Sequence, residues 1–341
     1  MSQNWPAVTE GDYIVKDFRF NNGSTLPELK LHYRTLGKLK TDQNGHALNA
    51  VLIMHGTSGS GAQFLVDHFA GKLFNPGQLL DANTYFLIIR DGIGHGGSSK
   101  PSDGLRAKFP RYGYRDMVRG DYELLTKHLG VDHLRLVMGT SMGGMHSWLW
   151  GSTYPDFMDA VMPLASLPAK ISGRNRMTRK MAMDAIKSDP EWQGGDYPAD
   201  KQPRGLITAL YVLVFMSSCP LQMQVECPDR ETADAWLDAK IAEGMKEKDA
   251  NNLCFAFDAS HDYDPPVQNI KAPLLAVNFA DDQVNPPELG IFERETMKIA
   301  RGKAILMPIS EATRGHGTHT IAEVWDDYLK ELLQSSDKAK L

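Results

Sequence analysis

Two kinds of apolar pattern occur along the chain. Residues 51–54 and 85–89 are apolar at nearly every position, which is typical of strands buried on both faces of a parallel sheet. Residues 13–20 and 29–36 instead alternate apolar and polar side chains, which predicts an antiparallel pair at a sheet edge. The chain is therefore expected to begin with an edge hairpin and to continue into a parallel sheet.

Helices are predicted between these strands. Residues 62–69 and 114–129 have apolar side chains at helical spacing, and Gly130 is placed to end the second helix, because glycine readily adopts the left-handed conformation found there. Further apolar runs, each predicted to be a strand, lie at residues 134–138, 160–164, 273–279 and 304–309. Another helix is predicted at 321–333. This alternation predicts an α/β fold with a doubly wound, mostly parallel sheet.

The alternation stops in the middle of the chain. Residues 166–266 separate two predicted strands by far more chain than an ordinary connection needs. Helical segments are predicted within this stretch at 177–187, 206–216 and 229–247. We therefore predict a helical lid at 166–266, inserted into a core formed by residues 1–165 and 267–341. The apolar segment 206–216 is expected to line a pocket or a dimer interface, since an exposed apolar helix promotes aggregation.

One pentapeptide points to a specific chemistry. Gly139-Thr140-Ser141-Met142-Gly143 follows the predicted strand at 134–138 and precedes helical sequence that continues to residue 154. Its G-x-S-x-G pattern is that of a nucleophile elbow, in which the glycines leave room for a strained turn that exposes the serine hydroxyl. The pattern is short, but the strand before it and the helix after it agree. Ser141 is therefore the candidate nucleophile.

A serine nucleophile needs a base, and the base needs an acid that orients it. Where such an elbow occurs, the acid and then the histidine follow the serine along the chain. Asp281 and Asp282 follow one predicted strand, and His316 follows the next. We predict Asp282 as the acid, because Pro286 lies four residues later at the expected start of a helix, and Asp281 is the alternative. His316 is the predicted base.

Two glycine-rich loops also follow predicted strands. In the loop at 55–59, the backbone N–H of Thr57 is predicted to form an oxyanion hole with that of Met142. The loop at 92–97 satisfies G-x-G-x-x-G, the dinucleotide-binding pattern. That pattern must open a helix whose N-terminus meets the pyrophosphate, but loop sequence follows here. No nucleotide cofactor is therefore predicted.

Other histidines are candidates for metal ligands or core residues. His316 and His319 are three residues apart, a spacing that can hold a metal ion on a helix together with a nearby Asp. Because a third ligand is missing at close spacing, we predict no metal and no other cofactor, with His319 as a structural neighbour of the base. His146 is expected to be a core or pocket-wall residue.

Composition and charge narrow the classes of partner and the cell compartment that we predict. The 341 residues carry a net charge of −5 at pH 7, with an isoelectric point near 6.1, so neither value predicts a nucleic-acid partner. The 3 cysteines are too few and scattered for a disulfide framework, which favours a cytoplasmic protein. The longest apolar run, 206–216, is shorter than the about 20 residues that span a bilayer, so no membrane partner is predicted.

Through these motifs, the chain resembles the homoserine O-acetyltransferase family of α/β-hydrolase-fold proteins. The likeness covers nearly the whole chain and is most specific at Ser141-Met142-Gly143-Gly144-Met145. Other matching segments are 33–37, 49–53, 115–118, Asp282 with 286–287, and 315–316. The resemblance implies Ser141 as nucleophile, Asp282 as orienting acid and His316 as base. It also implies a helical lid over the pocket and a homodimer formed through that lid.

Two departures lie where that family recognises homoserine. Its members usually have Asp directly after the catalytic histidine, where this chain has Gly317, and an Arg in a lid stretch that corresponds to the Arg-free residues 215–220. Without both charges a zwitterion loses its main anchors. Other lid arginines that can replace the missing one are Arg174, Arg176, Arg179 and Arg204.

We therefore expect a serine-dependent acyl hydrolase acting on an ester or thioester, with a small-molecule acyl substrate that includes acyl-CoA as a candidate. One alternative is a homoserine O-acetyltransferase or a related acyl-CoA-dependent O-acyltransferase. A second is a non-catalytic binding protein on the same fold, since a fold does not determine function.

Overall fold

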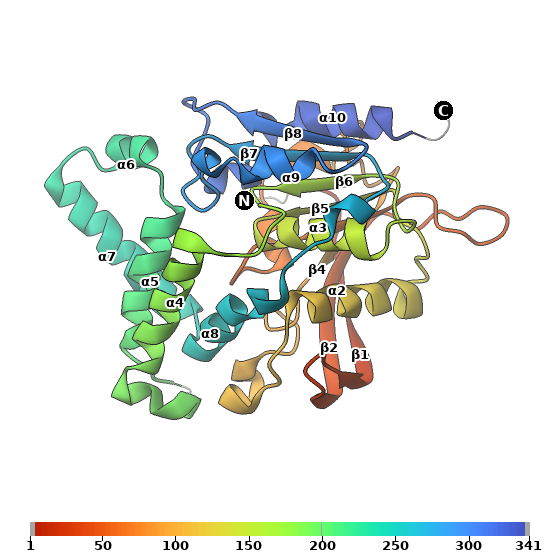
Figure 1. The fold of residues 1–341 in the computed structure, drawn as a ribbon. Helices are drawn as coiled ribbons and strands as arrows, with labels where there is room; N and C mark the ends of the chain where they lie inside the picture. The colour runs from red at the N-terminus through yellow and green to blue at the C-terminus, as the bar shows by residue number, and fades with distance from the viewer. Residues whose placement is uncertain (1–3, 199, 338–341) are drawn as a thin grey trace.

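The computed structural model describes residues 4–198 and 200–337. Their strands form one eight-stranded sheet in the order β1-β2-β4-β3-β5-β6-β7-β8. Each neighbouring pair from β4 to β8 in this order is parallel, whereas β2 pairs antiparallel with both β1 and β4. Helices cover both faces of the sheet (Figure 1). The predicted doubly wound, mostly parallel α/β fold is confirmed.

The strands lie where the apolar pattern predicted them. Strands β3 to β7 are buried almost throughout, since helices cover both of their faces, whereas the edge strands β1 and β8 are partly exposed. The strand bounds are β1 Thr9–Arg19, β2 Thr25–Leu36, β3 Ala50–Met54, β4 Phe86–Arg90, β5 Leu136–Thr140, β6 Val161–Leu164, β7 Leu274–Phe279 and β8 Gly302–Met307.

Two apolar cores lie on opposite faces of the sheet. One packs against α2 and α3, and the other against α1 and α10. The helix predicted at 114–129 is α2 continued by a π-helical turn, and Gly130 follows with the expected positive φ of 67°. The helices beside the sheet are α1 Ala70–Leu73, α2 Tyr114–Glu123, α3 Met142–Thr153, α9 Ile291–Thr296 and α10 Asp326–Ser335.

The helix predicted at 62–69 is wrong. The chain forms a single 3-10 turn over Gly61–Phe64 and enters α1 only at residue 70. Phe64, Phe69 and Phe74 are buried together, with ring centroids 4.7 and 5.9 Å apart for successive pairs. These side chains are five residues apart, a spacing that places them on different faces of an α-helix. The chain therefore turns here so that all three rings reach the same core.

The helix predicted at 321–333 begins later than expected. Two 3-10 turns, Gly317–Thr320 and Ala322–Val324, come first, and Trp325 has a non-helical φ of −131°. The Trp325 ring is fully buried beside Phe69 at a centroid distance of 5.8 Å. This packing belongs to the core on the α1 side of the sheet, and α10 starts immediately after it.

A group of helices lies between β6 and β7, at the end of the sheet that holds the elbow (Figure 1). We call α4 to α8 the helical insertion. It has its own apolar cluster, which includes Ile186, Leu206 and Leu253. The three predicted segments correspond to α4, α5 and α7, whereas α6 and α8 were not predicted. The helices are α4 Gly173–Lys187, α5 Gly205–Ser217, α6 Pro220–Glu226, α7 Arg230–Glu247 and α8 Ala250–Asp258.

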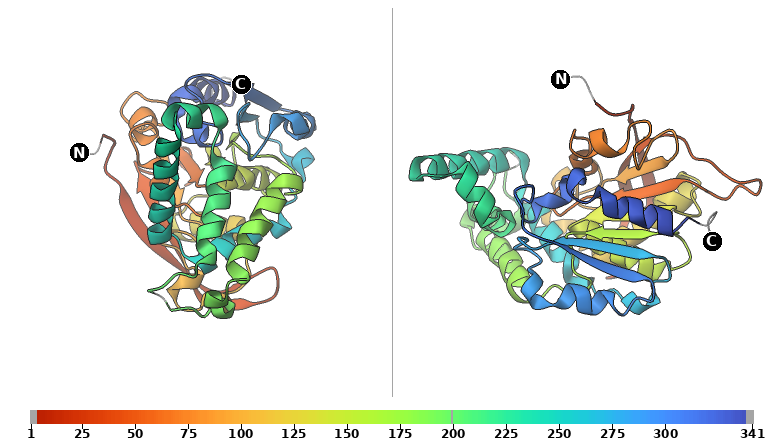
Figure 2. Two further views of the ribbon diagram at one scale, coloured as in Figure 1. Left: turned by 90° about the vertical axis from the view of Figure 1, so that its left-hand side faces the viewer. Right: turned by 90° about the horizontal axis from the view of Figure 1, so that it is seen from above.

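The outer part of the helical insertion packs less closely than its centre. Helices α6 and α7 project furthest from the sheet (Figure 2). Among the described residues of α7, only Ile241 is buried. That residues 166–266 form a separate lid domain, with the rest of the chain as its core, stays a prediction.

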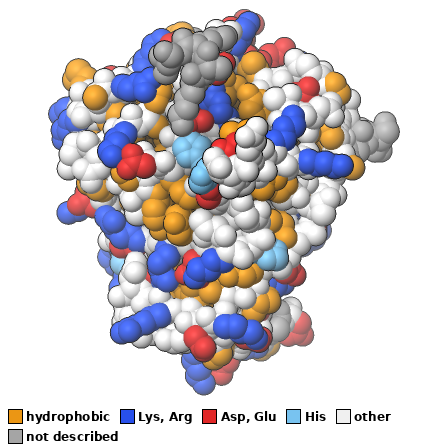
Figure 3. Space-filling view, turned by 90° about the vertical axis from the view of Figure 1, so that its right-hand side faces the viewer, with side chains coloured by type: hydrophobic (Ala, Val, Ile, Leu, Met, Phe, Trp, Pro, Cys, Tyr) orange, Lys and Arg blue, Asp and Glu red, His pale blue; other side chains and the backbone are white. Residues whose placement is uncertain are grey.

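The surface opposite the insertion carries positive and negative side chains mixed with small apolar areas (Figure 3). Within residues 4–198 and 200–337, no single helix has both the length and the apolar composition needed to cross a membrane. Helices α5 and α6 meet that test as a pair, and the chain bends by 107° between them.

Candidate active site

Ser141 lies at the apex of a tight turn between β5 and α3. Its φ of 55° and ψ of −114° form a strained conformation for a residue with a side chain. The glycines around it are required by packing. A Cβ atom at Gly139 would collide with the carbonyl group of Gly143, and one at Gly143 would collide with the carbonyl group of Met54. The predicted strand, strained turn and helix are therefore all present.

The structure brings the three predicted side chains into one hydrogen-bonded row. The Ser141 hydroxyl donates to His316 Nε2 over 2.8 Å, and His316 Nδ1 lies 2.8 Å from Asp282 Oδ2. Both distances are within the reach needed for a base to take a serine proton while an acid orients the ring. Ser141 follows β5, Asp282 follows β7 and His316 follows β8, so the carboxyl ends of three parallel strands supply the row.

Asp282 is fully buried and strongly hydrogen-bonded. Its Oδ1 accepts from the backbone N–H groups of Val284 at 2.7 Å and Asn285 at 3.2 Å, and Oδ2 accepts from the Asn285 side chain at 3.0 Å. Burial alone would raise the pKa of this carboxyl group, but His316 and these hydrogen bonds hold the pKa below its usual value. The side chain is therefore ionised near neutral pH and can hold the His316 ring.

Asp281, the alternative acid, contacts the backbone instead. Its Oδ2 accepts a hydrogen bond from the N–H of Gly315 at 3.0 Å. Gly315 has a φ of 56°, and a Cβ atom there would lie 2.7 Å from the Cβ of Cys219. Asp281 thus supports the loop before His316, while Asp282 contacts the ring itself.

The predicted oxyanion-hole residues flank Ser141. Thr57 lines the same cavity as Ser141 and His316, and the preceding Gly56 packs so closely that a Cβ there would lie 3.3 Å from the Ser141 Cβ. Met142 is the first residue of α3, where a backbone N–H has no partner within the helix. The use of these two N–H groups as an oxyanion hole stays a prediction.

A cavity of about 280 Å³ lies between Ser141 and the helical insertion. The predicted segment 206–216 does contribute to it, through the inner face of α5. Sequence reasoning missed the contributions of Gln63 and Phe257, whose local sequence carries no signal of a pocket. The lining residues are Gly56, Thr57, Ser58, Gln63, Ser141, Val284, His316 and His319 from the core, and Arg179, Leu213, Met216, Ser217 and Phe257 from the insertion.

One lid arginine lines this cavity, although the stretch at 215–220 contains none. Residues 215–220 supply Met216 and Ser217 but no arginine, as expected, whereas α4 supplies Arg179. Of the four lid arginines named as possible replacements, Arg179 lines the cavity. The described lining contains no Asp or Glu. The cavity therefore has a cation but no carboxylate to face an ammonium group.

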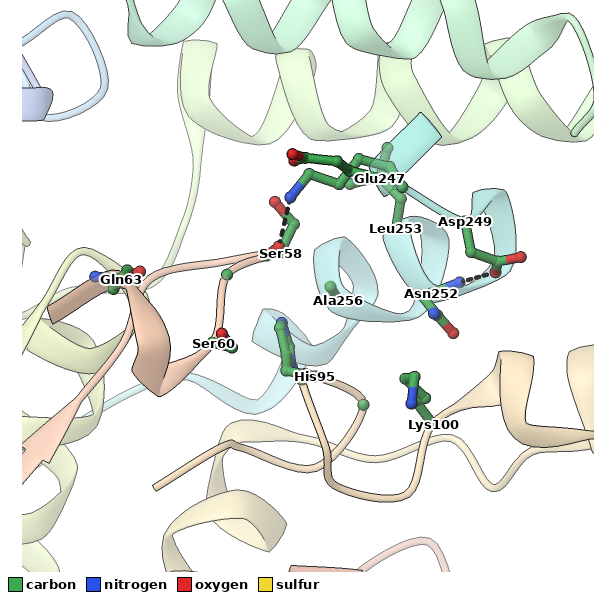
Figure 4. Close-up of a pocket in the computed structure, with 14 residues that line it drawn as sticks. Ser58, Ser60, Gln63, His95, Lys100, Glu247, Asp249, Asn252, Leu253 and Ala256 are labelled. Carbon is green, nitrogen blue, oxygen red and sulfur yellow. Dashed lines mark hydrogen bonds between the residues drawn. The ribbon is translucent and has the colours of Figure 1, made fainter. Parts of the chain in front are cut away.

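A second pocket, of about 410 Å³, adjoins the first and shares Ser58 and Gln63 with it (Figure 4). His95 and Lys100 lie on one side of it and Asn252 on the other. Burial lowers the pKa of His95 to about 4, so its ring is neutral. The glycine-rich loop at 92–97 thus forms a pocket wall, and a 3-10 turn, Pro101–Asp103, follows it after further loop.

The remaining histidines have separate roles. His146 is buried within α3 with Nδ1 2.5 Å from Arg90 Nη2, and burial followed by the Arg90 charge lowers its pKa well below the usual value. His319 lies edge-on to His316, with ring centroids 5.2 Å apart, and burial lowers its pKa to about 3. Within the described part of the chain, no group of three or more His, Cys, Asp or Glu side chains is placed to hold a metal ion.

Comparison with known proteins agrees with this architecture. The model of the alpha/beta hydrolase fold family matches residues 49–298. A solved structure of esterase E22 has the same fold, with a TM-score of 0.81 and 19% sequence identity, over 96% of this chain and 100% of the esterase.

Two curated relatives are more similar in sequence. A probable acyltransferase from Methanothermobacter thermautotrophicus is 29% identical over 280 residues, covering 81% of this chain and 84% of the relative. A homoserine O-acetyltransferase from Trichormus variabilis is 30% identical over 309 residues, covering 82% of each protein. These likenesses confirm the resemblance inferred from the sequence motifs. The chain is therefore an enzyme of the α/β-hydrolase fold family and a homoserine O-acetyltransferase-like member of it.

Proposed function

We propose that this enzyme is a serine-dependent acyl hydrolase that cleaves esters or thioesters through an acyl-enzyme intermediate. The observation that carries the proposal is the hydrogen-bonded row of Ser141, His316 and Asp282, which opens into a cavity without a carboxylate. The row supplies the nucleophile, base and orienting acid of acyl transfer. The cavity favours water over an amino-acid acceptor.

The first half of the reaction transfers the acyl group to the enzyme. Ser141 Oγ attacks the acyl carbonyl carbon while His316 Nε2 takes the hydroxyl proton. Asp282 keeps the other ring proton on Nδ1 and stabilises the imidazolium ion. The N–H groups of Thr57 and Met142 donate to the oxyanion. When the tetrahedral intermediate collapses, the alcohol or thiol leaves with the proton held by His316.

The second half returns the enzyme to its starting state. A water molecule in the vacated space gives a proton to His316 and attacks the acyl carbon of Ser141. Collapse of this second intermediate breaks the bond to Ser141 Oγ and returns the proton to the serine. The products are a carboxylic acid and the released alcohol or thiol.

The acceptor distinguishes this proposal from the main alternative. The two curated relatives are named an acyltransferase and a homoserine O-acetyltransferase, and the structural neighbour is named an esterase. Homoserine carries an ammonium and a carboxylate, and a specific site needs a partner for each. In this cavity Arg179 is available to the carboxylate, but Gly317 follows His316 and the described lining offers no anion to the ammonium. Water needs neither partner.

The deciding assay gives the purified enzyme acetyl-CoA with and without homoserine and follows both free CoA and O-acetylhomoserine. An activated acetyl ester, 4-nitrophenyl acetate, is tested in parallel for a burst followed by steady hydrolysis. We expect hydrolysis of the ester and little O-acetylhomoserine. Formation of O-acetylhomoserine at tens per second with a millimolar or lower KM, values typical of an efficient enzyme, would establish the transferase instead.

We also propose that the enzyme is a cytoplasmic homodimer that associates through the helical insertion. Phe215 and Val225, on α5 and α6, are 81% and 80% exposed, and Leu221 lies exposed between them in sequence. Exposed apolar side chains grouped in this way favour a protein contact. Sedimentation of the wild type and of Phe215→Ser/Val225→Ser is the test, since a monomer in both samples would contradict the dimer.

A further inference from the structure

Arg179 is a buried arginine without an anionic partner. It extends from α4 into the candidate active-site cavity, and 2% of its surface is exposed. Its Nε donates to Asn175 Oδ1 at 2.8 Å. Its Nη1 is buried and has no hydrogen-bond partner among the described residues, and no described carboxylate forms an ion pair with the side chain.

Arg90, the other buried arginine among the described residues, also has an Nη1 without a hydrogen-bond partner, but it is paired with an anion. Arg90 is fully buried, and its Nε donates to Asp121 Oδ2 at 3.0 Å. A guanidinium group is always charged, so burying one without an anion lowers stability. Arg179 has this unfavourable arrangement at the wall of a cavity that also contains Ser141 and His316. A ligand anion would supply the missing partner.

The surroundings of Arg179 leave its N–H groups available to such a ligand. Arg179 Cζ lies over the ring of Phe257, 5.4 Å from its centroid, in a cation–π contact that needs no N–H hydrogen bond. The N–H groups lie in the plane of the guanidinium, where they match the two oxygens of a carboxylate. Arg179 is the one Lys or Arg in the described lining, and the neighbouring His319 is neutral because burial lowers its pKa to about 3. The single positive charge of Arg179 therefore suits a ligand with a single negative charge.

We propose that Arg179 binds a carboxylate of the substrate, so that the enzyme prefers esters that carry a carboxylate and no ammonium group. This inference rests on the proposed hydrolase function and adds the substrate class to it. The carboxylate belongs either to the acyl group or to the alcohol, and both sources present the same group to Arg179. An amino acid is a poorer fit, because the described lining has no Asp or Glu to pair with its ammonium.

Two matched pairs of esters test the inference and separate the sources. Mono-4-nitrophenyl glutarate carries the carboxylate in its acyl group, and its methyl diester is the neutral control. 3-Acetoxybenzoate carries the carboxylate in its alcohol part, and methyl 3-acetoxybenzoate is the control. In each case kcat and KM are measured from release of the phenol. We expect the wild type to prefer the anionic member of one pair, and the preferred pair identifies the source.

The variants are Arg179→Met, Arg179→Lys and the control Arg176→Met, which removes a charge from the same helix outside the cavity lining. Arg179→Met is expected to lower kcat/KM for the anionic ester by about thirtyfold or more, mainly through KM, because a charged partner is lost. The neutral ester should change by less than about threefold. Arg179→Lys should retain part of the preference, since lysine keeps the positive charge but cannot donate two parallel hydrogen bonds to a carboxylate. Arg176→Met should match the wild type.

Thermal unfolding supplies a readout that does not depend on turnover. Monomethyl glutarate should raise the Tm of the wild type and of Arg176→Met but not that of Arg179→Met, and unliganded Arg179→Met should unfold at no lower temperature than the wild type. Equal losses for anionic and neutral esters, or a preference for the neutral member of both pairs, would overturn the inference. If the wild type hydrolyses neither 4-nitrophenyl acetate nor any of the four esters, the proposed function fails, and the Tm shift with monomethyl glutarate still decides whether Arg179 binds a carboxylate.

Discussion

The two walls of the candidate active-site cavity are built differently. On the core wall, Ser141, Asp282 and His316 follow buried parallel strands, and both carboxylate oxygens of Asp282 accept hydrogen bonds. On the insertion wall, Arg179 is buried without an ion pair to any described carboxylate, and α5 leaves Phe215 in solvent. We therefore expect the sheet to position the proposed reacting groups and the helical insertion to determine which substrate reaches them.

Packing around glycine also differs between regions of the molecule. In the elbow, a side chain at Gly139 or Gly143 would meet main-chain atoms, which cannot move without disturbing the sheet. In the insertion the two kinds of contact occur together. A Cβ atom at Gly205 would collide with the carbonyl oxygen of Ala185, whereas one at Gly244 would lie 2.9 Å from the side chain of Leu210, which can change its rotamer. The elbow therefore tolerates little change, whereas the outer helix α7 can vary more than the close contact between α4 and α5 at Gly205.

The largest effect is expected from removing the reacting groups of the core wall. Ser141→Ala and His316→Ala should each lower turnover of 4-nitrophenyl acetate by at least about a thousandfold. The reason is that the members of a Ser-His-Asp triad act as a unit. The control is Ser152→Ala, whose hydroxyl donates to carbonyl oxygens within α3. Steady-state kinetics and circular dichroism of each variant make the comparison. Near-normal activity in either variant would contradict the assignment of the nucleophile or base.

The two adjacent aspartates offer a sharper test. Asp282→Asn should lower kcat by about a hundredfold or more, because an amide neither fixes the useful tautomer of His316 nor stabilises its charged form. Asp281→Asn should lower kcat by less than about tenfold, since Asp281 contacts the backbone of Gly315. Both variants are compared in the same ester assay. Equal losses would mean that the loop supported by Asp281 is as important as the contact with the ring.

Alanine at two glycines compares the packing of the elbow with that of the outer helix α7. Gly143→Ala should lower the free energy of unfolding by about 3 kcal/mol, the upper end for overpacking, because its Cβ meets the carbonyl group of Met54. Gly244→Ala should change it by less than about 1 kcal/mol, since the better helix propensity of alanine offsets a small shift of Leu210. Urea unfolding measures both values. A similar loss in both variants would show that the elbow and α7 are equally rigid.

A smaller effect is expected in acid. Burial lowers the pKa of His319 from 6.5 to about 3, so the unfolded chain binds a proton at this site more readily than the folded chain. The stability linked to His319 is therefore complete above about pH 6.5 and decreases by about 1 kcal/mol per pH unit as the pH falls toward 3. His319→Gln should remove this part of the acid sensitivity, measured by urea unfolding from pH 7 to 4. His261→Gln, an exposed site at the end of α8, should leave it unchanged.

The sequence by itself determined the parts of this protein that depend on local rules. Buried strands require unbroken apolar runs, edge strands require alternation, and a strained serine requires glycines beside it, so the sheet, the edge hairpin and the elbow at Ser141 could all be predicted. The order of serine, acid and histidine also placed candidates at strand ends. The false helix at 62–69 shows the limit, because the burial of Phe64, Phe69 and Phe74 against one core outweighed helical spacing.

Only the tertiary structure decided which neighbours face the cavity. Asp281 and Asp282 are adjacent and chemically identical, and their different contacts arise from a turn that packs against a loop 34 residues later. Arg174, Arg176 and Arg179 lie on one helix, and the packing of α4 against α5 and α8 buries Arg179 in the cavity. Such choices depend on the orientation of side chains between segments that are distant in sequence, and local composition carries no information about that orientation.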